Sequence, residues 1–155
     1  RIVTVSGDAV HEPGNFKAPF GMNQAELIEA AGGYKVDPEK IISGGPMMGF
    51  SMFTVDVPVT KTSSSILCFT KDEVTQYEPT ACINCGRCVE VCPSRLIPSR
   101  LADYAEHHDE EAFTKHEGLE CMECGSCSYV CPAKRQLKQA IGSMRKTALA
   151  NRKKK

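Results

Sequence analysis

Eight of the nine cysteines fall into two runs that share one spacing, Cys-x-x-Cys-x-x-Cys-x-x-x-Cys-Pro. The runs are Cys82, Cys85, Cys88 and Cys92 before Pro93, and Cys121, Cys124, Cys127 and Cys131 before Pro132. Cysteine thiolates at this spacing hold [4Fe–4S] clusters. A glycine, Gly86 or Gly125, follows the second cysteine of each run, where a bulky side chain would crowd a cluster. The pattern therefore predicts two [4Fe–4S] clusters.

In this spacing pattern the fourth cysteine of each run binds the cluster of the other run. One cluster is accordingly assigned to Cys82, Cys85, Cys88 and Cys131, and the other to Cys121, Cys124, Cys127 and Cys92. Crossed ligation would keep the two clusters close together, so that an electron passes between them. The apolar neighbours of the cysteines are expected to shield the clusters; these are Ile83, Val89, Val91, Met122 and Val130.

Zinc and disulfide bonds are the two alternative roles for so many cysteines. Structural zinc sites use four ligands, often in two separated pairs that include histidine. Disulfide frameworks are typical of small secreted proteins, and the sequence shows no secretion signal. The regular tandem runs, each closed by Cys-Pro, disfavour both alternatives. Reduced thiolate ligands indicate a cytoplasmic or otherwise reducing compartment.

Composition sets few limits on the partners of the chain. The formal net charge of the 155 residues is zero, so no particular partner is favoured and nucleic acid is not expected. The sequence contains no apolar run of about 18 residues, the length that a transmembrane helix needs. The chain begins at Arg1 without a methionine, and we expect it to be a piece of a longer protein.

Basic residues gather at the end of the chain. Residues 134–155 contain nine Lys and Arg and no Asp or Glu. A solvated terminus is one interpretation, and contact with anionic lipid or an acidic partner protein is the other. Arg145, Lys146 and residues 152–155 are expected to face solvent.

The change in cysteine content divides the chain into residues 1–78 and 79–155, because the first part holds only Cys68. A helix is predicted from its N-cap residue Asn23 to the Gly32-Gly33 pair. Cys68 lies in an apolar run and is expected to be a buried, unreactive thiol. Runs of β-branched residues predict strands over 2–5, 9–12, 16–20, 40–43, 54–57 and 65–69, with the first two forming a hairpin. This pattern predicts a small α+β domain with its helix packed across a sheet.

The second part of the chain is predicted to form helices around the cysteine runs. One helix is predicted from Pro98 towards His108, and another from the N-cap Asp109 through Lys115, with Gly118 ending it. After Pro132 a single apolar helix face is formed by Leu137, Ile141, Met144 and Ala148. His107, His108 and His116 are interpreted as surface residues. The expected fold is an α-helical ferredoxin domain.

The segment Ile42–Gly49, with the sequence Ile-Ser-Gly-Gly-Pro-Met-Met-Gly, is followed by Pro58-Val59-Thr60-Lys61 and then by the two cysteine runs. In this order of motifs the chain resembles the family of C subunits of the Rnf electron-transport complexes, the ion-translocating ferredoxin:NAD oxidoreductases of bacteria. The resemblance implies an SLBB-like β-grasp domain over residues 1–78 and a ferredoxin domain with two clusters over residues 79–155.

The same resemblance implies a function and partners. The chain would be an electron relay in a peripheral subunit at the cytoplasmic face of the bacterial membrane, with other subunits and ferredoxin as partners. FMN and NAD are expected only in an upstream domain, since no Gly-x-Gly-x-x-Gly fingerprint occurs here. No catalytic residue is therefore expected within these residues.

Two further interpretations of function stay open on the sequence: a cobalamin-reductase-type flavin and iron–sulfur protein, and a non-catalytic iron–sulfur interaction module. The Gly44–Met48 segment also has two interpretations. It is either a sharp turn whose methionines pack into the sheet, or a place where the backbone approaches a flavin or nucleotide. Lys61 is interpreted as a solvated side chain.

Overall fold

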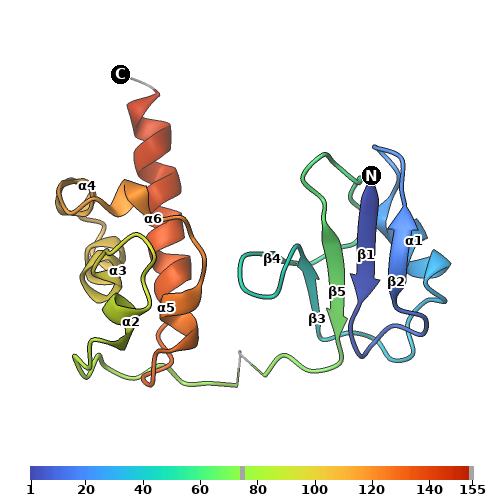
Figure 1. Cartoon of the computed structure of the whole chain (residues 1–155), viewed down its shortest axis with the longest axis horizontal. Helices are drawn as coiled ribbons and strands as arrows, with labels where there is room; N and C mark the ends of the chain where they lie inside the picture. The colour runs from blue at the N-terminus through green and yellow to red at the C-terminus, as the bar shows by residue number, and fades with distance from the viewer. Residues whose placement is uncertain (74–75, 154–155) are drawn as a thin grey trace. The chain divides into compact units, whose positions relative to one another are not determined.

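A computed structural model describes residues 1–73 and 76–153 of the chain, which divides into two compact units. The first unit comprises Arg1–Gln76 and the second Tyr77–Lys155. Figure 1 shows the strands confined to the first unit, whereas the second is built of helices and loops.

The first unit contains a five-stranded sheet in the order β2-β1-β5-β3-β4. Its central pair, β1 and β5, is parallel, and the other neighbours are antiparallel. The strands are β1 (Ile2–Ser6), β2 (Gly14–Lys17), β3 (Lys40–Ser43), β4 (Phe50–Met52) and β5 (Ser65–Phe69). The expected strands over 2–5, 40–43 and 65–69 are confirmed by β1, β3 and β5.

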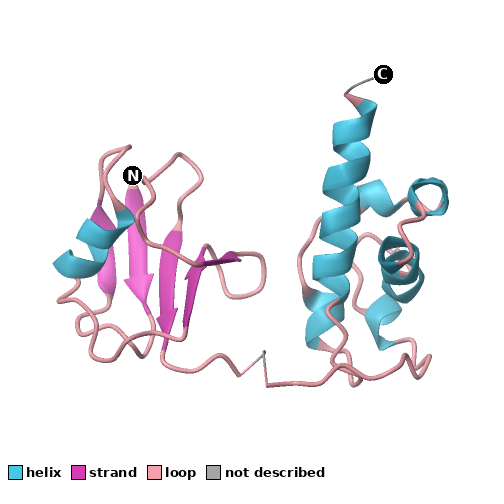
Figure 2. Cartoon of the chain, turned by 180° about the vertical axis from the view of Figure 1, so that it is seen from behind, coloured by secondary structure: helices cyan, strands magenta, loops and turns pink. Residues whose placement is uncertain are grey.

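The helix α1 (Gln24–Ala30) covers one face of the sheet (Figure 2). Asn23 is its N-cap, and the side chain of Asn23 accepts a hydrogen bond of 2.9 Å from the backbone N–H of Ala25, as expected. The helix ends at the predicted glycine pair, where Gly33 donates to the carbonyl of Ile28. The core between helix and sheet contains Val3, Val5, Leu27, Ile28, Ala31, Ile66 and Cys68.

Residues 9–12 do not form the predicted hairpin strand; the antiparallel partner of β1 is β2, which overlaps the extended segment expected over 16–20. The reason lies in backbone groups that are already committed elsewhere. Ala9 donates to the carbonyl of Cys68 at 3.2 Å, and Glu12 donates to the carbonyl of Ala31 at 2.9 Å. Segments distant in sequence therefore take the bonds that a hairpin partner would need.

The expected strand over 54–57 is also wrong, because the structure places β4 earlier, at Phe50–Met52. Residues 54–57 turn instead. Asp56 donates its backbone N–H to the hydroxyl of Thr54, and Val57 donates to the carbonyl of Val55 at 2.8 Å. The carbonyl of Val57 then accepts from Gln24 at the start of α1, so this segment supports the helix rather than the sheet.

The second unit contains five α-helices and a short 3₁₀ helix among its described residues. They are α2 (Arg87–Glu90), α3 (Pro98–Glu106), α4 (Glu110–Lys115), η1 (Gly118–Glu120), α5 (Ser126–Tyr129) and α6 (Leu137–Arg152). The predicted starts at Pro98 and at the N-cap Asp109 are confirmed. The predicted apolar face of α6 is also confirmed, since Leu137, Ile141, Met144 and Ala148 are all buried.

Gly118 has a different role from the predicted helix stop. The helix α4 ends at Lys115, as predicted, but Gly118 does not end it and instead begins η1. A Cβ added to Gly118 would lie 2.5 Å from the buried ring of Phe113. Glycine is therefore required here because the backbone packs directly against an aromatic ring.

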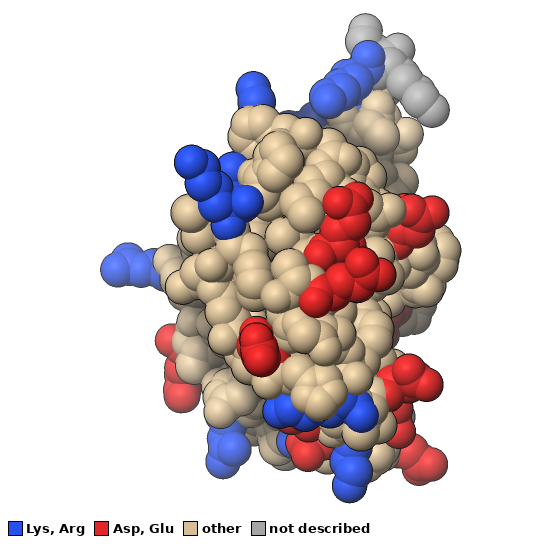
Figure 3. Space-filling view, turned by 90° about the vertical axis from the view of Figure 1, so that its right-hand side faces the viewer, with Lys and Arg blue, Asp and Glu red and all other residues tan. Residues whose placement is uncertain are grey.

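A charged contact joins α3 to the segment before α6. The guanidinium of Arg135 donates to Asp103 at 2.8 Å and to Glu106 at 2.9 Å. On the face that Figure 3 shows, acidic and basic side chains both occur on a mostly uncharged surface. Within the part of the chain that the structure describes, no helix has the length and apolarity to cross a membrane.

Candidate iron–sulfur centre

The two cysteine runs have the same backbone shape. Gly86 and Gly125 precede α2 and α5 with φ angles of 78° and 84°, in the left-handed region that glycine adopts without steric cost. The residue two positions before each glycine is also left-handed: Asn84 has φ 53° and Glu123 has φ 56°. The internal repeat expected from the sequence is thus a repeat of conformation as well.

Each short helix carries the third cysteine of its run, Cys88 in α2 and Cys127 in α5. After the fourth cysteine the chain makes a tight turn, in which Arg95 donates to the carbonyl of Cys92 at 3.0 Å and Lys134 donates to the carbonyl of Cys131 at 3.2 Å. The long helices α3 and α6 then begin at equivalent positions. These turns leave the fourth cysteines free to face away from their own runs.

The structure places the eight cysteines around two separate cavities. The first cavity, which we call the first cluster site, has a volume of about 110 Å³ and is lined by Cys82, Cys85, Cys88 and Cys131. The second, called the second cluster site, has a volume of about 20 Å³ and is lined by Cys92, Cys121, Cys124 and Cys127. Each cavity thus gathers three cysteines of one run and the fourth cysteine of the other.

All nine cysteines carry free thiols. Within residues 1–73 and 76–153, no group of three or more His, Cys, Asp or Glu side chains converges closely enough to hold a single metal ion. The thiols of each site therefore surround a cavity rather than meet at one point. Four thiol donors around a shared cavity are the donor set that a [4Fe–4S] cluster requires, so the residues present fit this group.

The second cluster site is the more enclosed of the two. Burial raises the pKa of Cys121, and it raises the pKa of Cys127 to about 11. The hydroxyl of Ser126, 3.5 Å from the sulfur of Cys124, instead lowers the pKa of that thiol. Iron binds the thiolate form, so cluster binding must offset the cost of ionising the two buried thiols.

Backbone groups also point at the sulfurs of this site. Leu96 donates its N–H to the sulfur of Cys92, and Glu123 donates to the sulfur of Cys121, each at 3.4 Å. Hydrogen bonds to ligand sulfur stabilise the thiolate and are one means by which proteins tune cluster potentials. In the first cluster site Cys82 and Cys85 are exposed and Cys88 is half-buried.

The expected shielding by apolar neighbours within the runs is confirmed in part. Ile83 lines the first cluster site and Met122 lines the second, although their side chains are 66% and 56% exposed. Val89 and Val91 are exposed and line neither site. The other apolar walls come from the segments after each Cys-Pro. Leu96, Leu101 and Ile141 line the second cluster site, and Leu137 lines the first. The sequence carried a signal for these residues, because Leu137 and Ile141 lie on the predicted apolar face of α6.

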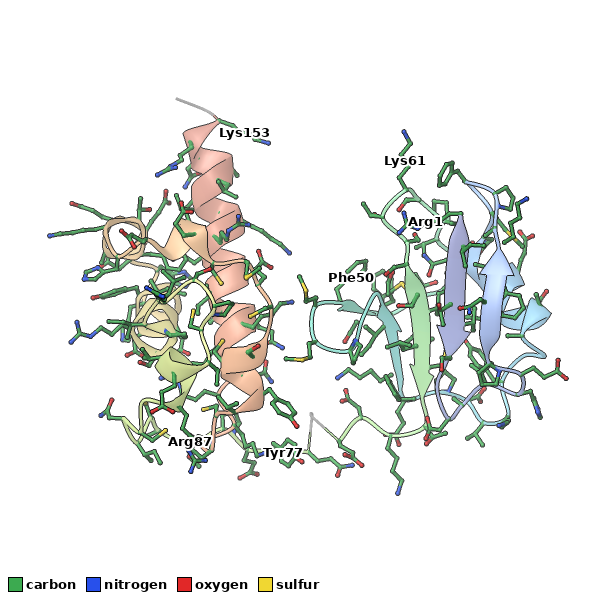
Figure 4. The ribbon with its side chains drawn as sticks, in the orientation of Figure 1. Arg1, Phe50, Lys61, Tyr77, Arg87 and Lys153 are labelled. Atoms are coloured by element: carbon green, nitrogen blue, oxygen red, sulfur yellow. The ribbon has the colours of Figure 1, made fainter. Side chains whose placement is uncertain are left out.

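The Gly44–Met48 segment connects β3 to β4 in the first unit. A Cβ added to Gly49 would lie 2.5 Å from the carbonyl oxygen of Gly45, so the turn requires glycine there. The expectation that the methionines pack into the sheet is wrong, because Met47 and Met48 are 44% and 60% exposed. Phe50, labelled in Figure 4, is also exposed, at the start of β4.

Two other residues behave as the sequence indicates. The side chain of Lys61 is exposed and points away from the sheet (Figure 4), while its carbonyl accepts a hydrogen bond from the guanidinium of Arg1. Cys68 is fully buried in the core of the first unit, and burial raises the pKa of its thiol to about 11. The thiol of Cys68 lines neither cluster site.

The fold and the site define a class of protein in which a small β-rich domain precedes a helical domain with cysteine runs for two clusters. Residues 2–51 match the family model of the SLBB domain, and residues 81–135 match that of the 4Fe-4S dicluster domain. The chain is thus an SLBB domain followed by a 4Fe-4S dicluster ferredoxin domain, and the predicted α+β fold class is confirmed.

The relatives that this chain matches are named as subunits of ion-translocating oxidoreductase complexes. The chain is 46% identical over 102 residues to the C subunit of the proton-translocating ferredoxin:NAD(+) oxidoreductase complex of Clostridium ljungdahlii, a match that covers 66% of this chain and 22% of the relative. It is 42% identical over 108 residues to the C subunit of the Na(+)-translocating ferredoxin:NAD(+) oxidoreductase complex of Acetobacterium woodii, which covers 70% of this chain and 24% of the relative.

A third relative, the C subunit of the ion-translocating oxidoreductase complex of Yersinia enterocolitica, is 41% identical over 112 residues, or 72% of this chain and 16% of the relative. The resemblance to the C subunits of Rnf complexes is therefore confirmed. The chain spans less than a quarter of the length of these relatives.

Proposed function

We propose that this chain relays electrons through two [4Fe–4S] clusters, as part of the C subunit of a membrane-bound, ion-translocating ferredoxin:NAD oxidoreductase. The observation that carries the proposal is the grouping of eight thiols around two cavities, each with one cysteine from the opposite run. The names of the relatives support the oxidoreductase and the complex.

The lining of the two cavities supports the ligand assignment. Cys82, Cys85, Cys88 and Cys131 hold one cluster, and Cys121, Cys124, Cys127 and Cys92 hold the other. When bound, each cluster supplies one-electron redox chemistry at a potential that its surroundings adjust. The crossed fourth ligands tie the two sites together, while Leu137 and Ile141 keep water from their walls.

The two parts of the chain have separate roles in this proposal. Residues 1–78 form an SLBB-like β-grasp domain that docks the chain, and residues 79–155 form the ferredoxin domain. The partners are other subunits of the complex and ferredoxin, and the chain lies at the cytoplasmic face of the membrane. FMN and NAD bind to an upstream domain, so no hydride transfer takes place within residues 1–155.

Metal analysis of the anaerobically reconstituted chain tests the proposal. We expect about eight iron and eight sulfide per chain, because two [4Fe–4S] clusters require these amounts. Cys92→Ser is expected to impair the cluster held by the run Cys121–Cys127 while leaving the other cluster in place. Cys68→Ser is the matched control, since this buried thiol lies in the other unit, and it should retain both clusters.

Two results would contradict this proposal. Stable binding of two zinc ions without sulfide would reject the iron–sulfur assignment. Loss of the cluster at Cys82, Cys85 and Cys88 in the Cys92→Ser variant, with the other cluster intact, would reject the crossed ligation, because each cluster would then take all its ligands from a single run.

A further inference from the structure

Glu123 occupies an unusual position in the second cysteine run. It lies between Cys121 and Cys124, and its φ of 56° is in the left-handed region that residues other than glycine seldom adopt. Its backbone N–H donates to the sulfur of Cys121 at 3.4 Å. The same residue therefore shapes the cysteine loop and places a carboxylate next to the second cluster site, whose cavity it also lines.

Helix α6 holds this carboxylate through Arg145. The guanidinium Nη1 of Arg145 lies 3.3 Å from Oε1 of Glu123, and its Nε donates to the carbonyl of Leu119 at 2.9 Å. The side chain of Arg145 thus contacts both the cysteine loop and η1, which leads into that loop. The expectation that Arg145 faces solvent is wrong, because its side chain is only 31% exposed and is paired with Glu123.

A glycine on α6 makes room for the pair. Gly142 lies one turn before Arg145, and a Cβ added there would come within 3.0 Å of Oε2 of Glu123. Glycine in a helix interior is destabilising relative to alanine, so its presence here needs a local reason. The carboxylate of Glu123 provides that reason, since it occupies the space beside the helix.

The first cysteine run has no equivalent of the ion pair between Glu123 and Arg145, although its backbone has the same shape. The two runs are 39 positions apart, so Asn84 corresponds to Glu123, and Glu106 corresponds to Arg145. Asn84 carries no charge, and Glu106 pairs with Arg135 instead. The first cluster site is also lined by a guanidinium, that of Arg135, but this group is paired with Asp103 and Glu106 of α3. Among the described residues, the ion pair between a carboxylate of the cysteine loop and a guanidinium of the following long helix therefore occurs at the second cluster site and not at the first.

We infer that Arg145 is a positioning residue that holds the Glu123 carboxylate beside the second cluster site and, by balancing its charge, sets the reduction potential of this site apart from that of the first. This inference rests on the proposed function, since it presupposes a cluster at each site. Adding an electron is disfavoured by a nearby negative charge, and the half-buried pair is screened less by salt than surface charges are.

Redox titration of the cluster-loaded chain, followed by electron paramagnetic resonance, tests this inference with single and double variants. Arg145→Gln leaves the carboxylate unbalanced and should lower one of the two midpoint potentials. Glu123→Gln leaves the guanidinium unbalanced and should raise the same potential. Each change should alter the ratio of reduced to oxidised cluster at a given potential by at least about threefold, or about 28 mV for one electron.

The double variant Glu123→Gln/Arg145→Gln should return that potential close to the value of the unaltered chain, because both charges are then absent. Arg145→Lys should keep the potential close to that of the unaltered chain, since the positive charge remains. Lys146→Gln is the matched control, because it removes the same charge from the exposed neighbouring position on α6. The other midpoint potential should stay unchanged in all variants.

The inference would be overturned if Arg145→Gln and Glu123→Gln moved the potential in the same direction. It would also be overturned if neither moved the potential further than Lys146→Gln does. If the Arg145→Gln chain does not assemble its clusters, Glu123→Gln alone tests the inference. An unchanged potential in Glu123→Gln then overturns the inference. Iron and sulfide are measured in every sample. An unaltered chain without clusters would reject the proposed function itself, whereas loaded variants with unmoved potentials would reject only this inference.

Discussion

At the scale of single residues, the nine cysteines separate into two chemical groups. Eight line the cluster sites, whereas Cys68 is fully buried among apolar side chains in the other unit. Burial disfavours the charged thiolate and raises the pKa of Cys68 to about 11, compared with 9.0 for an unperturbed thiol. A buried thiol that stays protonated is a poor nucleophile, because only the thiolate reacts.

The raised pKa gives a prediction about pH. The folded state favours the neutral thiol of Cys68, so its contribution to stability is complete below the unfolded pKa of 9.0 and is lost as the pH rises through about 11. We expect the first unit to lose less stability between pH 8 and pH 10.5 in the Cys68→Ala variant than in the unaltered chain. Urea unfolding at both pH values measures the difference, and equal losses in both proteins would contradict it.

Gly118 gives a second prediction at this scale. A methyl group at this position would meet the ring of Phe113, which is fully buried. Overpacking of this kind typically costs about 1–3 kcal/mol, so Gly118→Ala should lower the thermal midpoint of the cluster-loaded second unit. Gly45→Ala, in the first unit and with no atom within 4 Å of an added Cβ, should leave this midpoint unchanged. An unchanged midpoint in Gly118→Ala would show that the ring moves aside.

Spacing in the sequence was sufficient to propose the ligands, because thiolates two or three residues apart in a tight loop have few other uses. It could not identify Glu123 and Arg145 as a pair. Their contact joins residues 22 positions apart, and it depends on the turn of α6 against the loop. The role of Gly142 could not be predicted from the sequence either, because a glycine within a helical pattern can be present for many reasons.

At the scale of elements, helices were predicted better than strands. Asn23, Pro98 and Asp109 mark helix starts through local hydrogen bonding and backbone geometry, and each signal is correct. Strands depend on partners that the local sequence does not reveal. Residues 9–12 have suitable side chains, but their N–H groups bond to segments near Cys68 and Ala31 instead of to β1.

The two units should respond differently to loss of iron. The first has a core of its own between α1 and the sheet, so we expect its structure to survive chelation. In the second, the core includes Cys88, Cys92, Cys121, Cys127 and Cys131 as partly buried members. Because metal binding supplies folding free energy to such a core, chelation should abolish most of the helical circular dichroism.

Backbone amide exchange, measured before and after anaerobic chelation, distinguishes the units residue by residue. Val5 and Ile66 in the central strands should keep their protection, whereas Leu101 and Ile141 in α3 and α6 should lose it. Loss of protection in β1 and β5 together with α6 would contradict independent stability of the first unit.

At the scale of the whole molecule, the formal charge of zero conceals an uneven distribution. The second unit, Tyr77–Lys155, contains 13 Lys and Arg and 10 Asp and Glu, and its excess of positive charge gathers at the end of the chain. Arg152 and Lys153 are exposed at the end of α6, where Figure 4 labels Lys153. Lys154 and Lys155 lie outside the described residues.

The buried face of α6 limits what this end can do. Leu137, Ile141, Met144 and Ala148 pack inside the second unit, so they are not free to enter a lipid surface. Asn151 is likewise engaged, since its amide donates to Glu110 at 2.7 Å. Attraction to an anionic surface must therefore come from exposed charges, which include Lys146 and those that follow Asn151, and a test should leave Asn151 in place.

Replacing Lys153, Lys154 and Lys155 with glutamine isolates those charges without disturbing α6. If the basic end contacts anionic lipid, each lysine near the surface contributes on the order of 1 kcal/mol, so the triple variant should bind vesicles rich in phosphatidylserine at least tenfold more weakly. The affinity of the unaltered chain should fall between 50 and 300 mM salt, because the Debye length shortens as ionic strength rises. Replacing Lys17, Lys35 and Lys71 in the first unit with glutamine removes the same charge elsewhere and serves as the control. Equal binding by both triple variants would assign the basic end to solvent, whereas selective loss in the first would place it at an anionic surface.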